Sequence, residues 1–293
     1  MPEGRIVKAL SGFYYVLAGD RLIQCRGRGV FRKQKVSPLV GDYVEYQADN
    51  DQEGYILAIH KRKNELIRPP IANVDQAILV FSAVRPDFST ALLDRFLVLI
   101  ESKHIQPLIC ITKMDLLSEE HKQNILRFAD EYRSFGYKVL LTSTADESSL
   151  DPLRHCLAHK VSVFAGQSGV GKSSLLNALR PELCLKTDEI SDSLGRGKHT
   201  TRHVELISAE GGLVADTPGF SSLDLTDIEG NDLPFFFPEM VRVSGQCKFR
   251  GCLHVNEPKC AVKAAVEHEE LPLYRYQHYL QFMEEIKERK PRY

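Results

Sequence analysis

Gly166-Gln167-Ser168-Gly169-Val170-Gly171-Lys172-Ser173 is the segment of this chain that indicates its fold most directly. It matches the pattern GxxxxGK(S/T), follows an apolar segment at 161–165 that predicts a strand, and precedes a segment at 173–179 that predicts a helix. In this context the glycines let backbone N–H groups point at phosphates, Lys172 adds a positive charge, and the Ser173 hydroxyl can bind Mg²⁺. We therefore predict a phosphate-binding loop at 166–173, extended by Ser174 in the following helix.

The composition is that of an ordinary globular protein. Of the 293 residues, 43% are hydrophobic and 26% are charged, and the formal net charge is -1. No apolar run approaches the roughly 20 residues that span a bilayer, and residues 1–10 lack the apolar stretch of a signal peptide. The seven cysteines are odd in number, which favours reduced thiols over disulfides. We expect a cytoplasmic protein that does not interact with membranes.

The N-terminal part, residues 1–63, reads as a small β-barrel. Short segments of alternating polarity lack any helical pattern and are separated by Gly, Asp and Asn; they lie at 5–10, 13–17, 21–25, 42–46 and 55–60. Five such strands favour an OB-type barrel, a fold that often binds nucleic acid. A basic, glycine-rich stretch at 26–35 suits that role.

The remaining chain divides into an α/β domain and a smaller unit. Within 64–225, buried strands are predicted at 74–83, 107–112, 138–142, 161–165 and 212–215, and helices at 92–103, 121–135 and 173–179. Within 226–293 the strand patterns end, and helices are predicted at 261–268 and 273–290. We therefore expect three domains, with the phosphate-binding loop in the central one.

Further motifs indicate which base the central domain reads. Thr112-Lys113-Met114-Asp115 ends a predicted strand and resembles the (N/T)KxD motif, in which the carboxylate accepts hydrogen bonds from guanine. Ser143 ends the next strand and is a candidate for a backbone contact to the base. Asp216-Thr217-Pro218-Gly219 follows another strand, where Asp216 can hold Mg²⁺ through water and the Gly219 amide can sense a γ-phosphate.

The order of these motifs is permuted relative to ordinary GTPases. Residues 112–115 and Ser143 precede the phosphate-binding loop, although the corresponding motifs normally follow it. Permutation can preserve the site because the termini of compact domains often lie close together. The polar segment at 186–203 is the expected position of a mobile switch loop, in which either Thr200 or Thr201 can contact Mg²⁺ and the γ-phosphate.

A compact cluster of metal-binding residue types marks the C-terminal unit. Cys247, Cys252, His254 and Cys260 follow the spacing CxxxxCxHxxxxxC. Three thiolates and one imidazole suit a closed tetrahedral Zn²⁺ site with no open position for chemistry. We predict one structural zinc ion, as small units with thin cores commonly need one to fold.

Together these motifs resemble the ribosome small-subunit-dependent GTPase A family over nearly the whole chain. The resemblance implies a slow GTPase that binds GTP and GDP, acts in late assembly of the bacterial 30S subunit, contacts 16S rRNA and is stimulated by that subunit. It also makes His199 the candidate catalytic residue, because the matching loop of the family carries a histidine beside paired threonines. Phe220 stands where many GTPases have a water-orienting Gln, which predicts slow intrinsic turnover.

Two other functions compete with this interpretation. One is a nucleotide-gated RNA-binding module in which hydrolysis is incidental, and the absence of a Gln at Phe220 favours it. The other is a metabolic phosphate-loop enzyme such as a small-molecule kinase, which the motif at 112–115 and the RNA-binding-like flanking units disfavour. Other assembly factors are conceivable partners, and a monomer is the default expectation.

Overall fold

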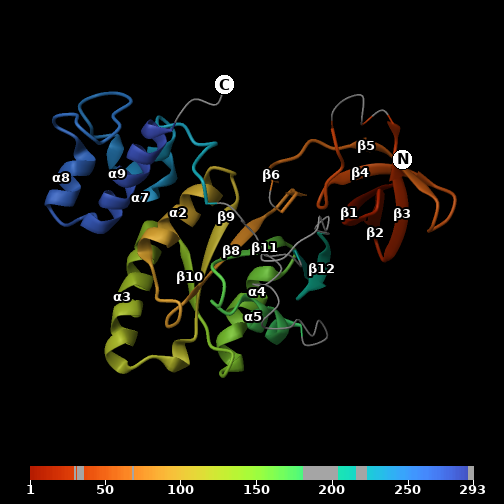
Figure 1. Cartoon of the computed structure of the whole chain (residues 1–293), viewed down its shortest axis with the longest axis horizontal. Coiled ribbons are helices and arrows are strands. Elements are labelled where there is room, and N and C mark those ends of the chain that lie inside the picture. The colour runs from red at the N-terminus through yellow and green to blue at the C-terminus, as the bar shows by residue number, and fades with distance from the viewer. Residues whose placement is uncertain (30, 32–35, 68, 181–203, 216–222, 290–293) are drawn as a thin grey trace.

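The N-terminal part of the chain is a closed β-barrel (Figure 1). The computed structural model describes residues 1–29, 31, 36–67, 69–180, 204–215 and 223–289. The barrel has the strand order β1-β2-β3-β5-β4 and closes by antiparallel pairing of β1 with β4. Its strands are β1 (Glu3–Leu10), β2 (Phe13–Ala18), β3 (Arg21–Gly27), β4 (Tyr43–Ala48) and β5 (Gly54–Ile59). Alternate residues point inward and bury an apolar interior, as the sequence pattern predicted.

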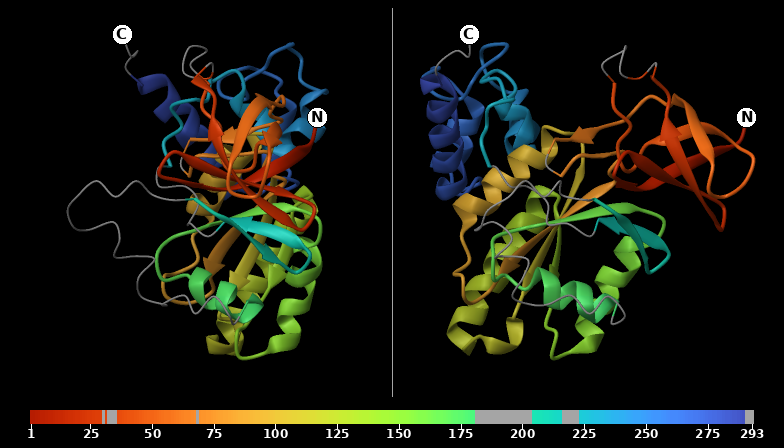
Figure 2. Two further views of the ribbon diagram at one scale, coloured as in Figure 1. Left: turned by 90° about the vertical axis from the view of Figure 1, so that its right-hand side faces the viewer. Right: turned by 45° about the vertical axis from the view of Figure 1, so that its right-hand side comes forward.

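The barrel is fixed to the rest of the chain by close backbone packing and ion pairs. Gly41 has a φ of 93°, and a Cβ at this position would lie 2.0 Å from the carbonyl oxygen of Ala72. Ala72 belongs to the short hairpin of β6 (Glu65–Leu66) and β7 (Ile71–Ala72) that follows the barrel. On another side, Lys8 Nζ of β1 pairs with Glu205 Oε2 at 2.6 Å, where the barrel meets the end of the central sheet (Figure 2).

The central part is a six-stranded sheet with the order β10-β9-β8-β11-β13-β12. Its strands are β8 (Gln76–Ser82), β9 (Gln106–Thr112), β10 (Lys138–Leu141), β11 (Val161–Ala165), β12 (Leu206–Ala209) and β13 (Gly212–Ala215). All neighbours pair in parallel except β12, which runs antiparallel to β13 at one edge. Every residue of β8 is buried, as expected for a strand with both faces covered.

Helices cover both faces of this sheet. The helices are α2 (Thr90–Glu101), α3 (Glu119–Phe135), α4 (Asp151–Leu157) and α5 (Lys172–Leu179). One apolar core joins Leu79 and Phe81 of β8 to α2 and α3, and a second joins Ile78 and Val80 to α4 and α5. Successive residues of one strand therefore serve opposite faces. Short 3₁₀ turns complete the region at Met114–Leu116 and Glu147–Leu150.

The C-terminal part is helical and packs on α2 (Figure 1). It comprises a 3₁₀ turn at Leu233–Phe236 and the helices α7 (Pro238–Ser244), α8 (Ala261–Glu267) and α9 (Leu273–Glu288). Val98 and Leu99 of α2 join its apolar core, which is separate from both cores of the sheet. A buried ion cluster crosses the same boundary, because Arg275 of α9 contacts both Asp94 of α2 and Glu239 of α7.

The fold class predicted from sequence is confirmed, with additional short elements. The sequence patterns predicted neither the hairpin strands β6 and β7, nor β12, nor the short helices α4 and α7. β12 has four residues, and α4 and α7 have seven each, so none is long enough to give a clear periodic signal. These elements are held by tertiary packing instead, as shown by β12 pairing along its whole length with β13.

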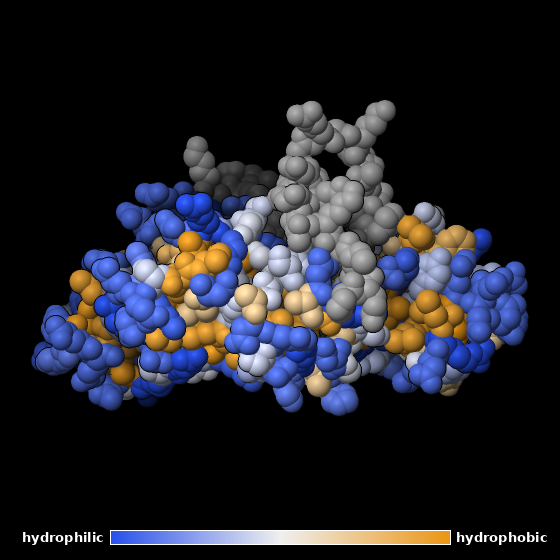
Figure 3. All heavy atoms as spheres, turned by 90° about the horizontal axis from the view of Figure 1, so that it is seen from below, coloured by the Kyte–Doolittle hydropathy of each residue, from blue (hydrophilic) through white to orange (hydrophobic). Residues whose placement is uncertain are grey.

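Hydrophilic and hydrophobic residues are interspersed on the face of the molecule shown in Figure 3. Among the residues that the structure describes, no helix has both the length and the apolar character needed to cross a membrane.

Candidate nucleotide-binding and metal sites

The predicted nucleotide-binding motifs lie at the carboxyl ends of parallel strands of the central sheet. Residues 112–115 begin at the last residue of β9, Ser143 follows β10, and the phosphate-binding loop follows β11. Since parallel strands end at the same edge of a sheet, the three segments gather at the carboxyl edge of the order β10-β9-β8-β11. The permuted chain order is thus compatible with one continuous site.

The phosphate-binding loop has the backbone that its glycines predict. Gly166, Gly169 and Gly171 have φ values of 147°, 79° and 99°, a region that residues with a Cβ rarely adopt. At Gly166 a Cβ would also lie 2.1 Å from the carbonyl oxygen of Val80 in β8. The loop then enters α5 at Lys172, so the first N–H groups of the helix face the end of the loop.

Lys172 is folded against its own loop. Its Nζ donates hydrogen bonds to the carbonyl oxygens of Gly166 at 2.8 Å and Gln167 at 2.5 Å. The residue is buried, and this desolvation lowers the pKa of its ammonium group to about 8. A phosphate placed beside it would favour the charged form again. Ser173 is also buried, whereas Gln167 and Ser168 at the tip of the loop are exposed.

Thr112 and Lys113 tie the loop to the end of β9. Thr112 Oγ1 donates to the carbonyl oxygen of Val170 at 2.6 Å. Lys113 Nζ donates to the carbonyl oxygen of Gly169 at 2.7 Å and also to that of Arg85. These bonds run from one predicted motif to the other, so the sequence prediction that they belong to one site has a direct geometric counterpart. Thr112 uses its hydroxyl for a structural contact beneath the loop.

Asp115 and Ser143 meet beside the loop. Ser143 Oγ donates to Asp115 Oδ1 at 2.5 Å and accepts from the backbone N–H of Ala145 at 3.0 Å. Ser149 Oγ accepts from the backbone N–H of Ser143 at 2.9 Å, which fixes the turn after β10. Asp115 is exposed, and no described residue donates a hydrogen bond to its Oδ2. The carboxylate is therefore oriented on one side and open on the other. The backbone N–H of Met114 donates a hydrogen bond to the carbonyl oxygen of Thr142 at 3.3 Å.

Several predicted residues lie outside the described part of the chain, and others were missed by sequence reasoning. His199, Thr200, Thr201, Asp216 and Gly219 belong to the segments 181–203 and 216–222, so their predicted roles stay predictions. The carbonyl of Arg85, the carbonyl of Val80 and the hydroxyl of Ser149 all support the site but match no motif. Contacts made by backbone carbonyls and by a single loop hydroxyl leave no recognisable pattern in the sequence, so no sequence signal could have identified them.

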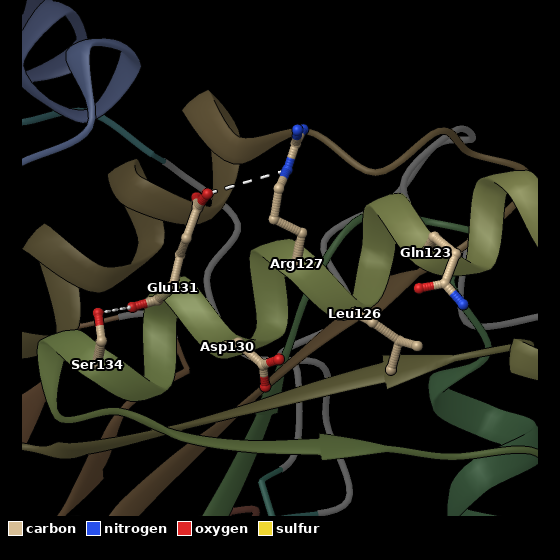
Figure 4. Close-up of a pocket in the computed structure, with 6 residues that line it drawn as sticks. All are labelled: Gln123, Leu126, Arg127, Asp130, Glu131 and Ser134. Atoms are coloured by element: carbon tan, nitrogen blue, oxygen red, sulfur yellow. Dashed lines mark hydrogen bonds and ion pairs between the residues drawn. The ribbon is translucent and has the colours of Figure 1, made fainter. Parts of the chain in front are cut away.

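A shallow pocket elsewhere in the domain contains none of these residues. It lies on one surface of α3 and is lined by Gln123, Leu126, Arg127, Asp130, Glu131 and Ser134 (Figure 4). An ion pair between Arg127 Nε and Glu131 Oε1, 3.9 Å apart, lies along its rim. All six lining residues belong to a single helix, so the pocket lacks the convergent groups of an enzyme site.

The predicted metal ligands converge in the C-terminal part. The ligand atoms of Cys247, Cys252, His254 and Cys260 all lie within 4.8 Å of one another. Cys247 Sγ and Cys260 Sγ are 4.0 Å apart, and His254 Nδ1 is 3.7 Å from the former and 3.3 Å from the latter. Tetrahedral Zn²⁺ with Zn–S bonds of about 2.3 Å separates two sulfurs by about 3.8 Å. The donors present therefore fit one zinc ion.

Surrounding residues hold this cluster in place. The Ala261 N–H points at Cys247 Sγ, 3.3 Å away, an orientation that favours a thiolate. Glu257 accepts from the N–H groups of Leu253 and Val255, both at 2.9 Å, and so shapes the loop that carries His254. Tyr276 of α9 donates to the carbonyl oxygen of His254 at 2.7 Å. The cluster thus joins the loop to α9.

Comparison with known proteins identifies the family. A family model described as RsgA GTPase matches residues 59–226, more than half of the chain. The chain belongs to the RsgA GTPase family. A second model, the RsgA N-terminal domain, matches residues 3–56, which include most of the barrel. As an RsgA GTPase, the protein is a hydrolase that acts on GTP.

Individual RsgA relatives match over their full lengths. The proteins named "Small ribosomal subunit biogenesis GTPase RsgA" from Bacillus pumilus and Bacillus subtilis are 64% and 65% identical, and each pairing covers 100% of both chains. The crystal structure of YloQ, described as a circularly permuted GTPase, is 61% identical with a TM-score of 0.88, covering 100% of this chain and 97% of that one. YjeQ from Thermotoga maritima is 37% identical with a TM-score of 0.88 and 99% coverage of both chains. The predicted permuted GTPase architecture is thereby confirmed.

Proposed function

We propose that this GTPase associates with the 30S ribosomal subunit in a nucleotide-dependent way, is stimulated by it and assists its late maturation. The observation that carries the enzymatic part is the bonding of Thr112 and Lys113 to the phosphate-binding loop beside Asp115 and Ser143. The names of the relatives in Bacillus support the ribosomal part. A cytoplasmic location and a monomeric state follow from this role as further proposals.

The proposed nucleotide contacts assign a role to each residue of the motifs. Backbone N–H groups of the loop and the ammonium of Lys172 would bind the phosphates of GTP or GDP, and Ser173 and Ser174 would contact the phosphates or their Mg²⁺. Asp216, Gly219 and one of Thr200 and Thr201 would complete the metal and γ-phosphate contacts. Magnesium would neutralise charge that develops on the phosphates. Asp115 would read guanine, with Ser143 orienting its carboxylate.

The proposed domain division is 1–63, 64–225 and 226–293, with the barrel and the zinc unit flanking the GTPase domain. In this arrangement both flanking units contact 16S rRNA. Exposed cations support this role on each side, since Arg26 and Arg28 lie on the barrel and Lys248 and Arg250 lie beside the metal cluster. We expect this protein to contact other assembly factors only while both are bound to the 30S subunit, and not in free solution.

Steady-state hydrolysis tests the proposed function. We expect purified protein to hydrolyse GTP slowly and 30S subunits to accelerate it strongly, while ATP hydrolysis and the addition of 50S subunits have no such effect. Lys172→Ala abolishes the activity because the phosphates lose their positive partner.

His199→Ala tests the proposed catalytic residue and is expected to retain GDP binding while losing stimulation by 30S subunits. Failure of 30S to accelerate hydrolysis would leave a guanine-nucleotide-binding protein whose turnover is incidental.

Base selectivity provides a separate prediction. Asp115→Ala removes a charged hydrogen-bond acceptor worth about 1.5–3 kcal/mol, so GDP affinity should fall about 10- to 150-fold. Asp115→Asn offers one donor and one acceptor, which match the C2 carbonyl and N1–H of xanthine, so preference should shift toward XDP. Titration with fluorescent GDP and XDP measures both effects. Asp130→Asn, the same change on exposed α3, is the matched control and should leave both affinities unchanged.

A further inference from the structure

One row of side chains on the outside of the barrel has no role in the nucleotide site. The strand registers place Phe13 opposite Arg26, Arg26 opposite Tyr55, and Tyr55 opposite Gln47. Directly opposed residues share a face, so the four side chains form a continuous row across β2, β3, β5 and β4. Their neighbours Cys25, Gly54 and Ile56 are buried, which assigns the row to the outer surface.

The row combines aromatic rings with a positive charge that forms no ion pair in the described part of the chain. The guanidinium of Arg26 lies over the ring of Phe13, 4.8 Å from its centroid, and pairs with no carboxylate among the described residues. Tyr55 is 53% exposed, a high value for an aromatic side chain on a barrel strand. Arg28 adds a second exposed cation just beyond β3. At the adjacent turn, Arg21 pairs with Asp51 and so offsets acidic charge there.

Dimensions and chemistry favour one kind of partner. Phe13, Arg26 and Tyr55 span two strand intervals of about 4.8 Å, so their row is about 10 Å long, a length that accommodates two or three stacked bases. Aromatic rings and an arginine plane stack on the faces of bases, while the positive charge attracts the phosphate backbone. A duplex hides its base faces, so it cannot use such a row. An acidic protein partner would exploit Arg26 but leave Tyr55 without a function.

We propose that the row of Phe13, Arg26 and Tyr55 is a stacking platform for unpaired bases of RNA. The proposal rests on the proposed function, because it identifies how the barrel would contact rRNA. It adds that the contact is made to exposed bases, through stacking, in addition to contacts with the phosphate backbone.

Binding of a labelled, unstructured 12-nucleotide RNA to the full-length protein tests the platform by fluorescence anisotropy. We expect Tyr55→Ala and Arg26→Ala each to weaken binding about 5- to 150-fold, the loss expected for one stacked base. Tyr55→Phe keeps the ring and should retain affinity, whereas Arg26→Lys keeps the charge but loses the plane and should not restore it. Leu22→Ala, which removes another exposed apolar side chain from β3, is the matched control and should bind normally.

Three results would overturn the proposal. These are an absence of binding to single-stranded RNA, equal losses for Tyr55→Ala and Leu22→Ala, and equal competition by a duplex of the same sequence. Stimulation of wild-type GTP hydrolysis by 30S subunits is measured in parallel. If 30S subunits stimulate the wild type but Tyr55→Ala binds the RNA as tightly as the wild type, the platform alone is rejected. If 30S subunits do not stimulate the wild type, the proposed function is rejected.

Discussion

Arg275→Ala is expected to destabilise the protein by about 3–5 kcal/mol, the loss typical of breaking a buried ion pair by removing one partner. The side chain of Arg275 is 1% exposed and contacts Asp94, which is fully buried, and Glu239, which is almost so. Burial by itself would lower the pKa of Arg275, but Asp94 and Glu239 outweigh this effect and hold it above its ordinary value. The arginine therefore stays charged.

The expected effect is large because of what the substitution leaves behind. Asp94 would keep hydrogen bonds from Tyr132 and His278, whose Nδ1 is 2.6 Å from Asp94 Oδ2. Glu239 has no other described partner, so its carboxylate would remain buried and unpaired. The guanidinium also stacks over the ring of Phe237, 4.6 Å from its centroid, and this contact disappears too. Since Asp94 lies on α2 and Arg275 on α9, the loss falls on the boundary between the GTPase and C-terminal parts.

Urea unfolding followed by circular dichroism measures this loss, since the chain contains no tryptophan to report by fluorescence. Arg127→Ala is the matched control: it removes a largely exposed arginine paired with Glu131 and should change stability by less than about 0.5 kcal/mol. Combining Arg275→Met with Asp94→Asn and Glu239→Gln should recover much of the stability, because no charge then remains unpaired. A triple variant as unstable as Arg275→Ala would show that the lost hydrogen bonds, rather than unpaired charge, dominate.

Removal of zinc is expected to unfold the C-terminal part while leaving the central sheet folded. Structural zinc sites release about 10–16 kcal/mol on binding, which is comparable with the whole stability of a typical domain, about 5–15 kcal/mol. The cluster anchors the loop at Cys252 and His254, and that loop in turn accepts hydrogen bonds from Tyr276 and Tyr279 of α9. Without the metal, no bond joins the three thiols and the imidazole. The loop that carries them is then no longer held in place for its hydrogen bonds with α9.

Metal content and hydrogen exchange together test this expectation. The purified protein should contain one zinc ion per chain, and His254→Ala should lose most of it together with amide protection in α8 and α9. His268→Ala, at the exposed end of α8, is the matched control and should retain both. Amides of β8 and β11 should stay protected in every sample, because their core is separate from that of the C-terminal helices. Full protection of α9 after complete removal of metal would refute a structural role for zinc.

Much of the site was predictable because its motifs depend on local backbone chemistry. The loop at 166–173 requires glycines at positions of positive φ, and the structure has such values at Gly166, Gly169 and Gly171. The metal cluster was predictable because three cysteines and a histidine occur within a short segment. The unusual motif order also indicated permutation directly.

The fold class, the β-barrel and the candidate residues of the nucleotide and metal sites could be predicted from the sequence, because alternation, glycine positions and ligand spacing act over a few residues. Which distant groups meet was set by tertiary packing. The contacts of Lys113 with Arg85 and of Arg275 with Asp94 join residues that no local pattern relates. The same holds for the outer row of Phe13, Arg26 and Tyr55, since strand register sets its alignment and register emerges from burying the opposite face of the barrel.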